Sequence, residues 1–250
     1  MLIEALPLLT DNYAWLLRQP GDSACAVIDP AAAAPVRDFL AARQLSLRWI
    51  LVTHHHLDHT GGVAELAVDG VRVVASTRDR ARVPAVTDAV ADGAILQVLG
   101  SRVEVLAVPG HTQGSLAYHL PTAAAVFTGD ALFAAGCGRL LEGEPEQLYA
   151  SLQRLAALPP TTQIFCGHEY TARNLAFAQS LDPGDLAVAA RLREVLAARA
   201  RGAATVPASL AVELATNPFL RAHQPALAAC LGTPPGLPTF VALRRRRDRF

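Results

Sequence analysis

Metal-type ligands follow four predicted strands at the point where each strand ends. The runs "WILVT", "VLAVPG", "VFTG" and "IFCG" lead directly into His54, His111, Asp130 and His168. Loops at strand ends are held by a rigid scaffold and still remain open to a substrate. A glycine precedes three of these four ligands, which lets the backbone turn sharply and approach an ion closely. The chain is therefore expected to fold so that its strand ends present these side chains.

The segment "THHHLDH", residues 53–59, contains the densest group of ligands. His54 and His56 are two positions apart in an extended segment, so they point to the same side and can chelate one ion. Asp58 and His59 follow once the chain turns and can reach a second ion. His55 is expected to face away from its neighbours and is left out. A histidine run alone is often tag-like, but its internal position and the three later ligands favour a metal site.

The candidate ligands contain no sulfur. They are His54, His56, Asp58, His59, His111, Asp130 and His168. Five histidines and two aspartates are too many for one zinc ion, so the set suits two, and it argues against a zinc-finger type of structural site. Iron and manganese accept the same ligands. Two adjacent cations lower the pKa of a shared water from near 15.7 toward roughly 7, which would supply hydroxide at neutral pH.

Short strands are predicted for the first two thirds of the chain, and helices for most of the rest. Apolar or alternating runs between turn residues predict strands at 2–9, 12–19, 24–30, 48–54, 72–76, 115–121, 124–130 and 162–168, and a pair of strands within 94–110. Helical patterns lie at 34–44, 61–70, 146–158, 172–181, 185–200 and 208–215, and one late strand is expected at 239–243. This order predicts an α/β sandwich-like domain over residues 1–170 and a smaller helical domain over residues 171–250.

Composition and the N-terminus exclude several classes of protein. Basic and acidic residues balance at 22 each, so the chain lacks general polyanion-binding character. The four cysteines are scattered and form no C-x-x-C pair, which favours a reducing compartment over a disulfide framework. The N-terminus lacks the basic region of a signal peptide, and no apolar run is long enough to cross a bilayer. We expect a cytoplasmic protein with no membrane or nucleic-acid partner.

These motifs together resemble those of the metallo-β-lactamase superfamily. "THHHLDH" fits its T-H-x-H-x-D-H signature, and "PGHT", "TGD" and "CGHEY" fit its later ligand motifs. Further segments narrow the resemblance to glyoxalase II, the hydroxyacylglutathione hydrolases. They are "GCGRLLEG" (136–143), "CGHEYT" (166–171), "TNPFLR" (216–221) and the terminal "RRRRDRF". The resemblance covers nearly the whole chain.

The resemblance implies an αββα sandwich of two mixed sheets flanked by helices, followed by a helical domain that completes the substrate site. It also implies two divalent metal ions, with zinc expected first and iron or manganese as alternatives. One ion would be held by His54, His56 and His111, the other by Asp58, His59 and His168, and Asp130 would bridge the two together with a water or hydroxide. Asp58 and Asp130 are the carboxylates expected to take part in catalysis.

The family also has positions that contact the glutathione tripeptide. A basic residue of the "GCG(K/R)" loop, the tyrosine of "HEY" and two basic residues near the C-terminus match Arg139, Tyr170, Arg244 and Arg247 here. Arginine binds carboxylates through two parallel hydrogen bonds. Leu141 departs from the aromatic residue that is frequent at its place, which implies weaker packing against the glutathione backbone. Without this context, Arg139 would be read as a surface residue and Tyr170 as a core residue.

The activity implied is hydrolysis of S-(2-hydroxyacyl)glutathione thioesters. S-D-lactoylglutathione would give glutathione and D-lactate, the second step of methylglyoxal detoxification, and the enzyme is expected to be a monomer. The alternative is a glutathione persulfide dioxygenase of the same superfamily with one iron, which would not need Asp58, His59 and His168 together. A nucleic-acid-binding protein is suggested only by the arginine-rich tail. A β-lactamase is disfavoured because its second metal site often includes cysteine, and no cysteine replaces a ligand here.

Overall fold

The computed structural model describes residues 1–250 and divides into two compact units. The first comprises Met1–Ala107 and Gln113–Gly129, and the second comprises Val108–Thr112 and Asp130–Phe250. The domain boundary predicted at residue 170 lies inside the second unit.

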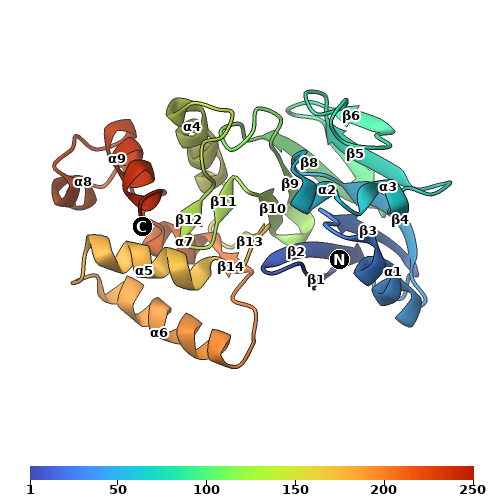
Figure 1. Ribbon diagram of the computed structural model, residues 1–250, viewed down its shortest axis with the longest axis horizontal. Coiled ribbons are helices and arrows are strands. Elements are labelled where there is room, and N and C mark those ends of the chain that lie inside the picture. The colour runs from blue at the N-terminus through green and yellow to red at the C-terminus, as the bar shows by residue number, and fades with distance from the viewer. The chain divides into compact units, whose positions relative to one another are not determined.

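The first unit contains a six-stranded mixed sheet (Figure 1). Its strands, in their order across the sheet, are β1 (Leu2–Leu8), β2 (Asn12–Arg18), β3 (Ala24–Ile28), β4 (Ser46–Leu51), β5 (Arg72–Ser76) and β6 (Asp88–Val90). The first three strands pair antiparallel, and β3 to β6 pair parallel. Strands buried on both faces are expected as continuous apolar runs, and the run "NYAWLL" of β2 is buried throughout.

Helices cover one face of this sheet. They are α1 (Ala33–Ala42) and α3 (Val63–Leu66), and a further short helix, α2 (Leu57–Thr60), precedes α3. Val36 of α1 and Val63 of α3 belong to the same buried cluster as Leu16 and Ile50 of the sheet. The helix predicted over 61–70 is thus only four residues long. Gly62 is the N-cap of α3, and a Cβ there would lie within 3 Å of the backbone of residues 30–33.

A second set of strands stacks on the other face of the first sheet. It runs in the order β10 (Ala125–Gly129), β9 (Leu116–Leu120), β8 (Ser101–Ala107) and β7 (Ile95–Val98), all antiparallel, with the 3-10 turn η1 (Pro121–Ala123) between β9 and β10. The Tyr118 hydroxyl donates a hydrogen bond of 2.7 Å to the carbonyl of Val52. The rings of Trp15 and Phe127 are 6.4 Å apart. The first unit is therefore a two-sheet sandwich with helices on one outer face.

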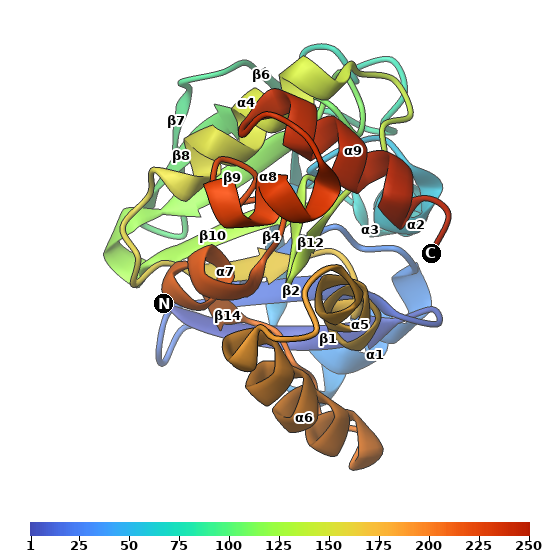
Figure 2. The same cartoon turned by 90° about the vertical axis from the view of Figure 1, so that its left-hand side faces the viewer.

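The second unit is mainly helical. Its elements are β11 (Leu132–Phe133), β12 (Gly136–Cys137), α4 (Pro145–Ala156), β13 (Gln163–Cys166), α5 (Thr171–Leu181), α6 (Leu186–Ala200), β14 (Ala208–Ser209), α7 (Leu210–Thr216), α8 (Pro225–Leu231) and α9 (Leu237–Arg247). A capping box formed by Glu144 and Gln147 starts α4. Helices α5 and α6 share a buried cluster, and α8 lies against α9 (Figure 2).

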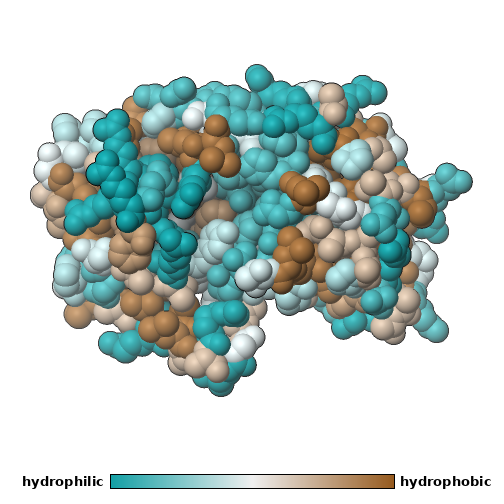
Figure 3. All heavy atoms as spheres, viewed as in Figure 1, coloured by the Kyte–Doolittle hydropathy of each residue, from teal (hydrophilic) through white to brown (hydrophobic).

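The prediction of a strand at residues 239–243 is wrong, because these residues lie inside α9. Pro238 stands in the first turn, where its missing N–H costs no helical hydrogen bond. Phe240, Leu243, Arg244 and Arg247 are buried, which is the three-and-four spacing of a helix face. The remaining arginines of this helix are exposed, and hydrophilic side chains gather over α9 in Figure 3.

The β11–β12 hairpin is anchored by two buried polar side chains. Asn217 donates through Nδ2 to the carbonyls of Phe133 (3.2 Å) and Gly136 (3.0 Å). Glu213 accepts a hydrogen bond of 2.7 Å from the backbone N–H of Ala135. A buried carboxylate and a buried amide must be satisfied in this way. The "TNPFLR" segment therefore holds the hairpin in place.

The four cysteines are free thiols, three of them buried and Cys230 exposed. No helix combines the length and the apolar character that a membrane span would need.

Candidate metal centre

In the first unit, the turn after β4 brings two predicted ligands together. His54 Nε2 lies 3.1 Å from His56 Nδ1. This is a hydrogen-bond distance, and two nitrogens this close could both offer a lone pair to one ion. The Thr60 hydroxyl donates a hydrogen bond of 3.0 Å to the carbonyl of His56 and thereby closes the turn. The expectation that residues two apart point to the same side agrees with this geometry.

His59 is oriented by a residue that the sequence reasoning missed, Asp29. Its Oδ2 lies 3.0 Å from His59 Nδ1, and the same carboxylate accepts from the backbone N–H of Thr53 (2.8 Å) and from its hydroxyl (2.6 Å). A carboxylate at Nδ1 fixes the tautomer that leaves Nε2 to ligate. The only signal in the sequence is the Asp-Pro pair directly after β3.

Asp58 and His55 also have partners far away in the sequence. Asn12 donates from Nδ2 to the Asp58 carbonyl (3.0 Å) and to Asp58 Oδ2 (3.2 Å). His55 Nδ1 lies 3.2 Å from Asp79 Oδ1. A Cβ on Gly114 would lie 2.3 Å from Asp79, so only glycine leaves room for that carboxylate. His55 thus faces a carboxylate outside the set of predicted ligands, in keeping with its exclusion.

In the second unit, Asp130 lies between two histidines. Its Oδ2 is 3.6 Å from His111 Nε2 and 3.4 Å from His168 Nε2. His111 Nδ1 lies 2.9 Å from the carbonyl of Arg139. Because a carbonyl can only accept, Nδ1 carries the proton and Nε2 offers its lone pair. This arrangement suits a divalent metal ion.

His168 is stacked on Tyr170, with ring centroids 4.7 Å apart and an angle of 6° between the planes. Phe133 contacts both rings edge-on. The aromatic contacts fix the orientation of His168 and also place Tyr170 beside the ligand.

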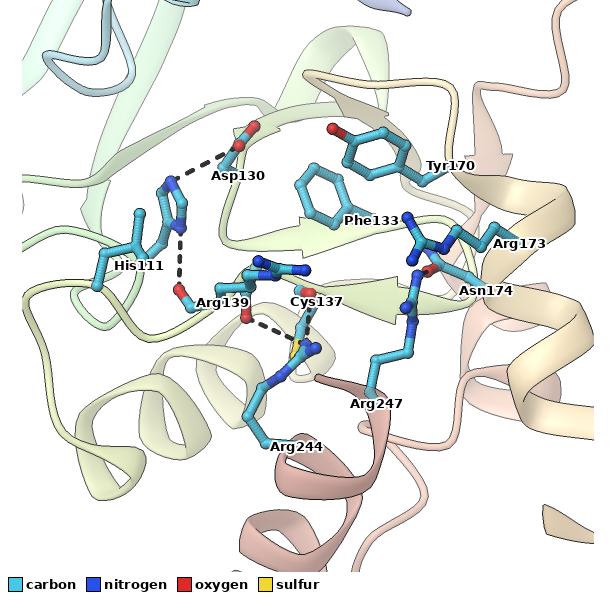
Figure 4. Close-up of a pocket in the computed structure, with 12 residues that line it drawn as sticks. His111, Asp130, Phe133, Cys137, Arg139, Tyr170, Arg173, Asn174, Arg244 and Arg247 are labelled. Atoms are coloured by element: carbon cyan, nitrogen blue, oxygen red, sulfur yellow. Dashed lines mark hydrogen bonds and ion pairs between the residues drawn. The ribbon is translucent and has the colours of Figure 1, made fainter. Parts of the chain in front are cut away.

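A pocket of about 260 Å³ opens next to Asp130 and His111 in the second unit (Figure 4). It is lined by His111, Asp130, Phe133, Cys137, Gly138, Arg139, Leu141, Tyr170, Arg173, Asn174, Arg244 and Arg247. The five residues that the sequence reasoning assigned to the substrate all lie along this pocket. Arg173, Asn174 and Phe133 were missed, because nothing in their local pattern separates them from ordinary helix or strand residues.

The pocket is strongly cationic. Burial lowers the pKa of the Arg247 guanidinium, and the neighbouring charges of Arg173, Arg244 and Arg139 lower that pKa further. Only Asp248 acts in the opposite direction. In Figure 4 the guanidinium groups of Arg173 and Arg247 lie next to each other near Asn174. An anionic ligand would relieve this mutual repulsion.

The thiol that lines the pocket is unsuited to nucleophilic attack. Burial raises the pKa of Cys137 to about 11, although Arg244 works in the opposite direction. A thiol is nucleophilic only as the thiolate. The reactive groups of this pocket are therefore the metal-type ligands and the arginines.

The donor chemistry of the seven predicted ligands fits a divalent metal ion. All seven are among the histidine and aspartate side chains that could offer a ligand atom to a metal. Imidazole nitrogens and carboxylate oxygens suit zinc, iron and manganese. In each unit, a carboxylate or carbonyl also fixes the tautomer of one histidine, which is the usual support for a metal ligand.

Two family descriptions match adjacent parts of the chain. Residues 9–168 match the metallo-beta-lactamase superfamily, and residues 169–250 match "Hydroxyacylglutathione hydrolase C-terminus". A hydroxyacylglutathione hydrolase of Methylococcus capsulatus is 48% identical over 98% of this chain and 97% of that protein. One of Methylobacillus flagellatus is 47% identical and covers 100% of both chains.

Solved structures support the fold. BLEG-1 B3 metallo-beta-lactamase superposes with a TM-score of 0.69 at 22% identity, over 88% of this chain and 99% of that one. ETHE1 from Myxococcus xanthus gives a TM-score of 0.61 at 29% identity, over 86% and 96%. The chain thus has the αββα metallo-β-lactamase fold with a C-terminal helical region. The full-length similarity to curated relatives shows that it belongs to the hydroxyacylglutathione hydrolase family.

Proposed function

We propose that this protein hydrolyses S-(2-hydroxyacyl)glutathione thioesters, with S-D-lactoylglutathione as the reference substrate. One observation carries the proposal: two predicted metal ligands, His111 and Asp130, line the same pocket as a group of arginines. A metal ion held by His111 and Asp130 would support hydrolysis of a thioester. The arginines would bind the two carboxylates of a tripeptide. The names of the full-length relatives point to the same reaction.

We also propose that the ligands hold two divalent ions. His54, His56 and His111 would hold one ion, Asp58, His59 and His168 the other, and Asp130 both. Bound there, such ions would supply hydroxide from water near neutral pH and Lewis acidity toward the thioester carbonyl. The donor set, the tautomers fixed by Asp29 and by the Arg139 carbonyl, and the family membership support this assignment. Zinc is the proposed metal, and iron and manganese remain compatible with the donors.

The side chains of the pocket bind and orient the substrate. Arg139, Arg247 and, in addition, Arg173 are proposed to attract the carboxylates of the tripeptide, and Tyr170 is proposed to contact its backbone. Leu141 is 59% exposed at the pocket and contributes only apolar surface. A thiol with a pKa of about 8.5 leaves without a strong general acid. The chain supplies no cysteine nucleophile here, because burial keeps the Cys137 pKa at about 11.

The proposed reaction is tested by mixing purified, metal-loaded protein with S-D-lactoylglutathione and titrating the free thiol released. We expect thiol release at enzymatic rates, and its near-complete loss in Asp130→Ala, which removes the carboxylate shared by His111 and His168. No thiol release by the metal-loaded wild type would rule out the proposal.

A persulfide dioxygenase is less supported, since residues 169–250 match the hydrolase C-terminus and the full-length relatives are named hydrolases. Oxygen consumption with glutathione persulfide would reveal it. We further propose that the protein acts as a cytoplasmic monomer on a small molecule, with residues 171–250 completing the substrate site. The free cysteines support the reducing compartment.

A further inference from the structure

Arg244, on the buried face of α9, has a guanidinium that is almost fully engaged within the protein. Nη1 donates to the carbonyls of Cys137 (2.9 Å) and Gly138 (3.3 Å). Nε and Nη2 donate to Asp248 Oδ1 at 3.1 Å and 2.8 Å. A guanidinium has five N–H groups, so these bonds leave only one N–H of Nη2. The side chain is also only 6% exposed.

The loop that Arg244 holds surrounds the predicted metal ligand His111. The next carbonyl along this loop, that of Arg139, lies 2.9 Å from His111 Nδ1. The backbone N–H groups of Leu141 and Glu142 both donate to the carbonyl of His111, at 3.3 Å each. Loop 137–142 thus grips both the ring and the backbone of His111.

The loop has little freedom to move on its own. A Cβ on Gly138 would lie 2.0 Å from the carbonyl oxygen of Asp130 and 3.2 Å from His111 Cβ. Gly138 also donates its N–H to the carbonyl of Ala131 at 3.2 Å. A displacement of the Cys137 and Gly138 carbonyls would therefore be passed to Asp130 and His111 by direct contact.

Arg247, one turn further along α9, is different. Its Nη2 donates a hydrogen bond of 3.1 Å to Asn174 Oδ1. Its guanidinium therefore keeps donors for a ligand in a pocket rich in positive charge. Arg244, in contrast, is paired with the Asp248 carboxylate at 2.8 Å, which Arg139 Nε also approaches at 4.0 Å.

We propose that Arg244, in addition to lining the pocket beside Arg247, is a positioning residue for His111. Arg244 ties α9 to loop 137–142, and this loop fixes the tautomer and the position of His111. The inference rests on the proposed function only in that His111 is taken as a metal ligand. It predicts that loss of Arg244 weakens metal binding, whereas loss of Arg247 weakens substrate binding.

The test compares Arg244→Met, Arg244→Gln and Arg247→Met in the full-length protein. Zinc affinity is measured by chelator competition, and the affinity of zinc-loaded protein for S-hexylglutathione by calorimetry. The Nδ1–H signal of His111 is followed by nitrogen NMR of the metal-free protein. Arg245→Met, an exposed arginine of the same helix, is the matched control.

We expect Arg244→Met to lower zinc affinity by about tenfold or more, the usual effect of losing support for a metal ligand, and to weaken the His111 Nδ1–H signal. Arg244→Gln, which keeps an amide donor but no charge, should lose less zinc affinity. Arg247→Met should instead lower the affinity for S-hexylglutathione and leave both other readouts unchanged. Arg245→Met should alter none of the three.

Should Arg244→Met fail to fold, Arg244→Gln carries the comparison and is expected to act in the same direction. The proposal is overturned if the folded variants keep wild-type zinc affinity and the His111 signal while losing S-hexylglutathione affinity as Arg247→Met does. Neither the zinc nor the NMR readout needs thioester hydrolysis. An inactive wild type would therefore defeat the proposed reaction and leave the role of Arg244 to be decided separately.

Discussion

At the scale of single residues, buried carboxylates and carbonyls decide which nitrogen of each histidine can reach a metal. The Asp29 carboxylate accepts hydrogen bonds from His59 Nδ1 and from the backbone N–H and hydroxyl of Thr53. Asp29 is only 3% exposed. The Arg139 carbonyl does the same for His111. The residue type alone is therefore not enough to make a metal ligand, because a histidine nitrogen that carries a proton cannot bind a metal ion.

Asp29→Asn should weaken metal binding. Its amide N–H can donate to His59 Nδ1, which favours the tautomer protonated at Nε2, the wrong one for a metal ligand. We expect zinc affinity to fall by about 10- to 100-fold in a chelator competition. Glu104→Gln is the matched control, because Glu104 Oε2 lies 3.1 Å from His119 Nδ1 and His119 is outside the ligand set. Equal zinc affinities in the two variants would contradict this account of Asp29.

Arg173→Ala should weaken the binding of glutathione conjugates. Arg173 lines the pocket, and of the neighbouring charges its own lowers the Arg247 pKa most. A hydrogen bond to a charged group contributes about 1.5–3 kcal/mol, so we expect Kd for S-hexylglutathione to rise by about 10- to 150-fold. Calorimetry of the zinc-loaded protein measures this, with the exposed Arg193→Ala of α6 as control. An unchanged Kd would remove Arg173 from the substrate site.

At the scale of elements, the ligand-bearing turns are held by close backbone contacts with their neighbours. Gly110, directly before His111, has φ of +143°, and a Cβ there would lie 2.4 Å from Leu148 Cβ of α4. Ser151 of the same helix donates to the carbonyl of Pro109 at 2.8 Å. Helix α4 thus fixes the position of the loop that carries His111.

Gly110→Ala should destabilise the protein and displace this loop. Overpacking costs about 1–3 kcal/mol, in addition to the strain of a positive φ. Gly232→Ala separates the two effects, because Gly232 also has a positive φ, +64°, but no atom within 4 Å of the added Cβ. Urea unfolding of both variants should show the larger loss for Gly110→Ala. If both variants lost a similar free energy of unfolding, the contact with Leu148 would contribute nothing to the destabilisation.

Much of this arrangement could be predicted from the sequence, because the ligands follow strand-type runs within a few residues. The substrate residues of the "GCGRLLEG" and C-terminal segments required the family resemblance as well. Asp29, Asn12 and Asp79 could not be found, since their partners lie 24 or more residues away and are brought close only by folding. The α9 segment was mistaken for a strand because "TFVAL" is short and apolar, a pattern that both structures share.

At the scale of the whole molecule, three of the four cysteines are sealed in the interior. Burial raises the pKa of Cys25 and Cys137 to about 11, and that of Cys166 to about 12. A raised thiol pKa favours the protonated form in the folded state. These thiols therefore stabilise the fold below pH 9 relative to higher pH, and this contribution is lost as the pH rises towards 11 and 12.

The buried cysteines should react more slowly with an alkylating reagent than the exposed one. At pH 8, iodoacetamide is expected to label native protein at the exposed Cys230 alone, and all four cysteines after unfolding in urea. Peptide mass spectrometry locates the label. Thioester hydrolysis should survive the native treatment, since no buried thiol takes part. Rapid labelling of Cys137 with loss of activity would contradict the proposed mechanism.

Seven side chains are proposed to hold two metal ions for thioester hydrolysis. The most direct measurement is a titration of metal-free protein with zinc, in which bound metal and S-D-lactoylglutathione hydrolysis are recorded at each addition. We expect activity to rise to a plateau when two zinc ions are bound per chain. A plateau at one ion, or full hydrolysis by protein kept metal-free with a chelator, would contradict it.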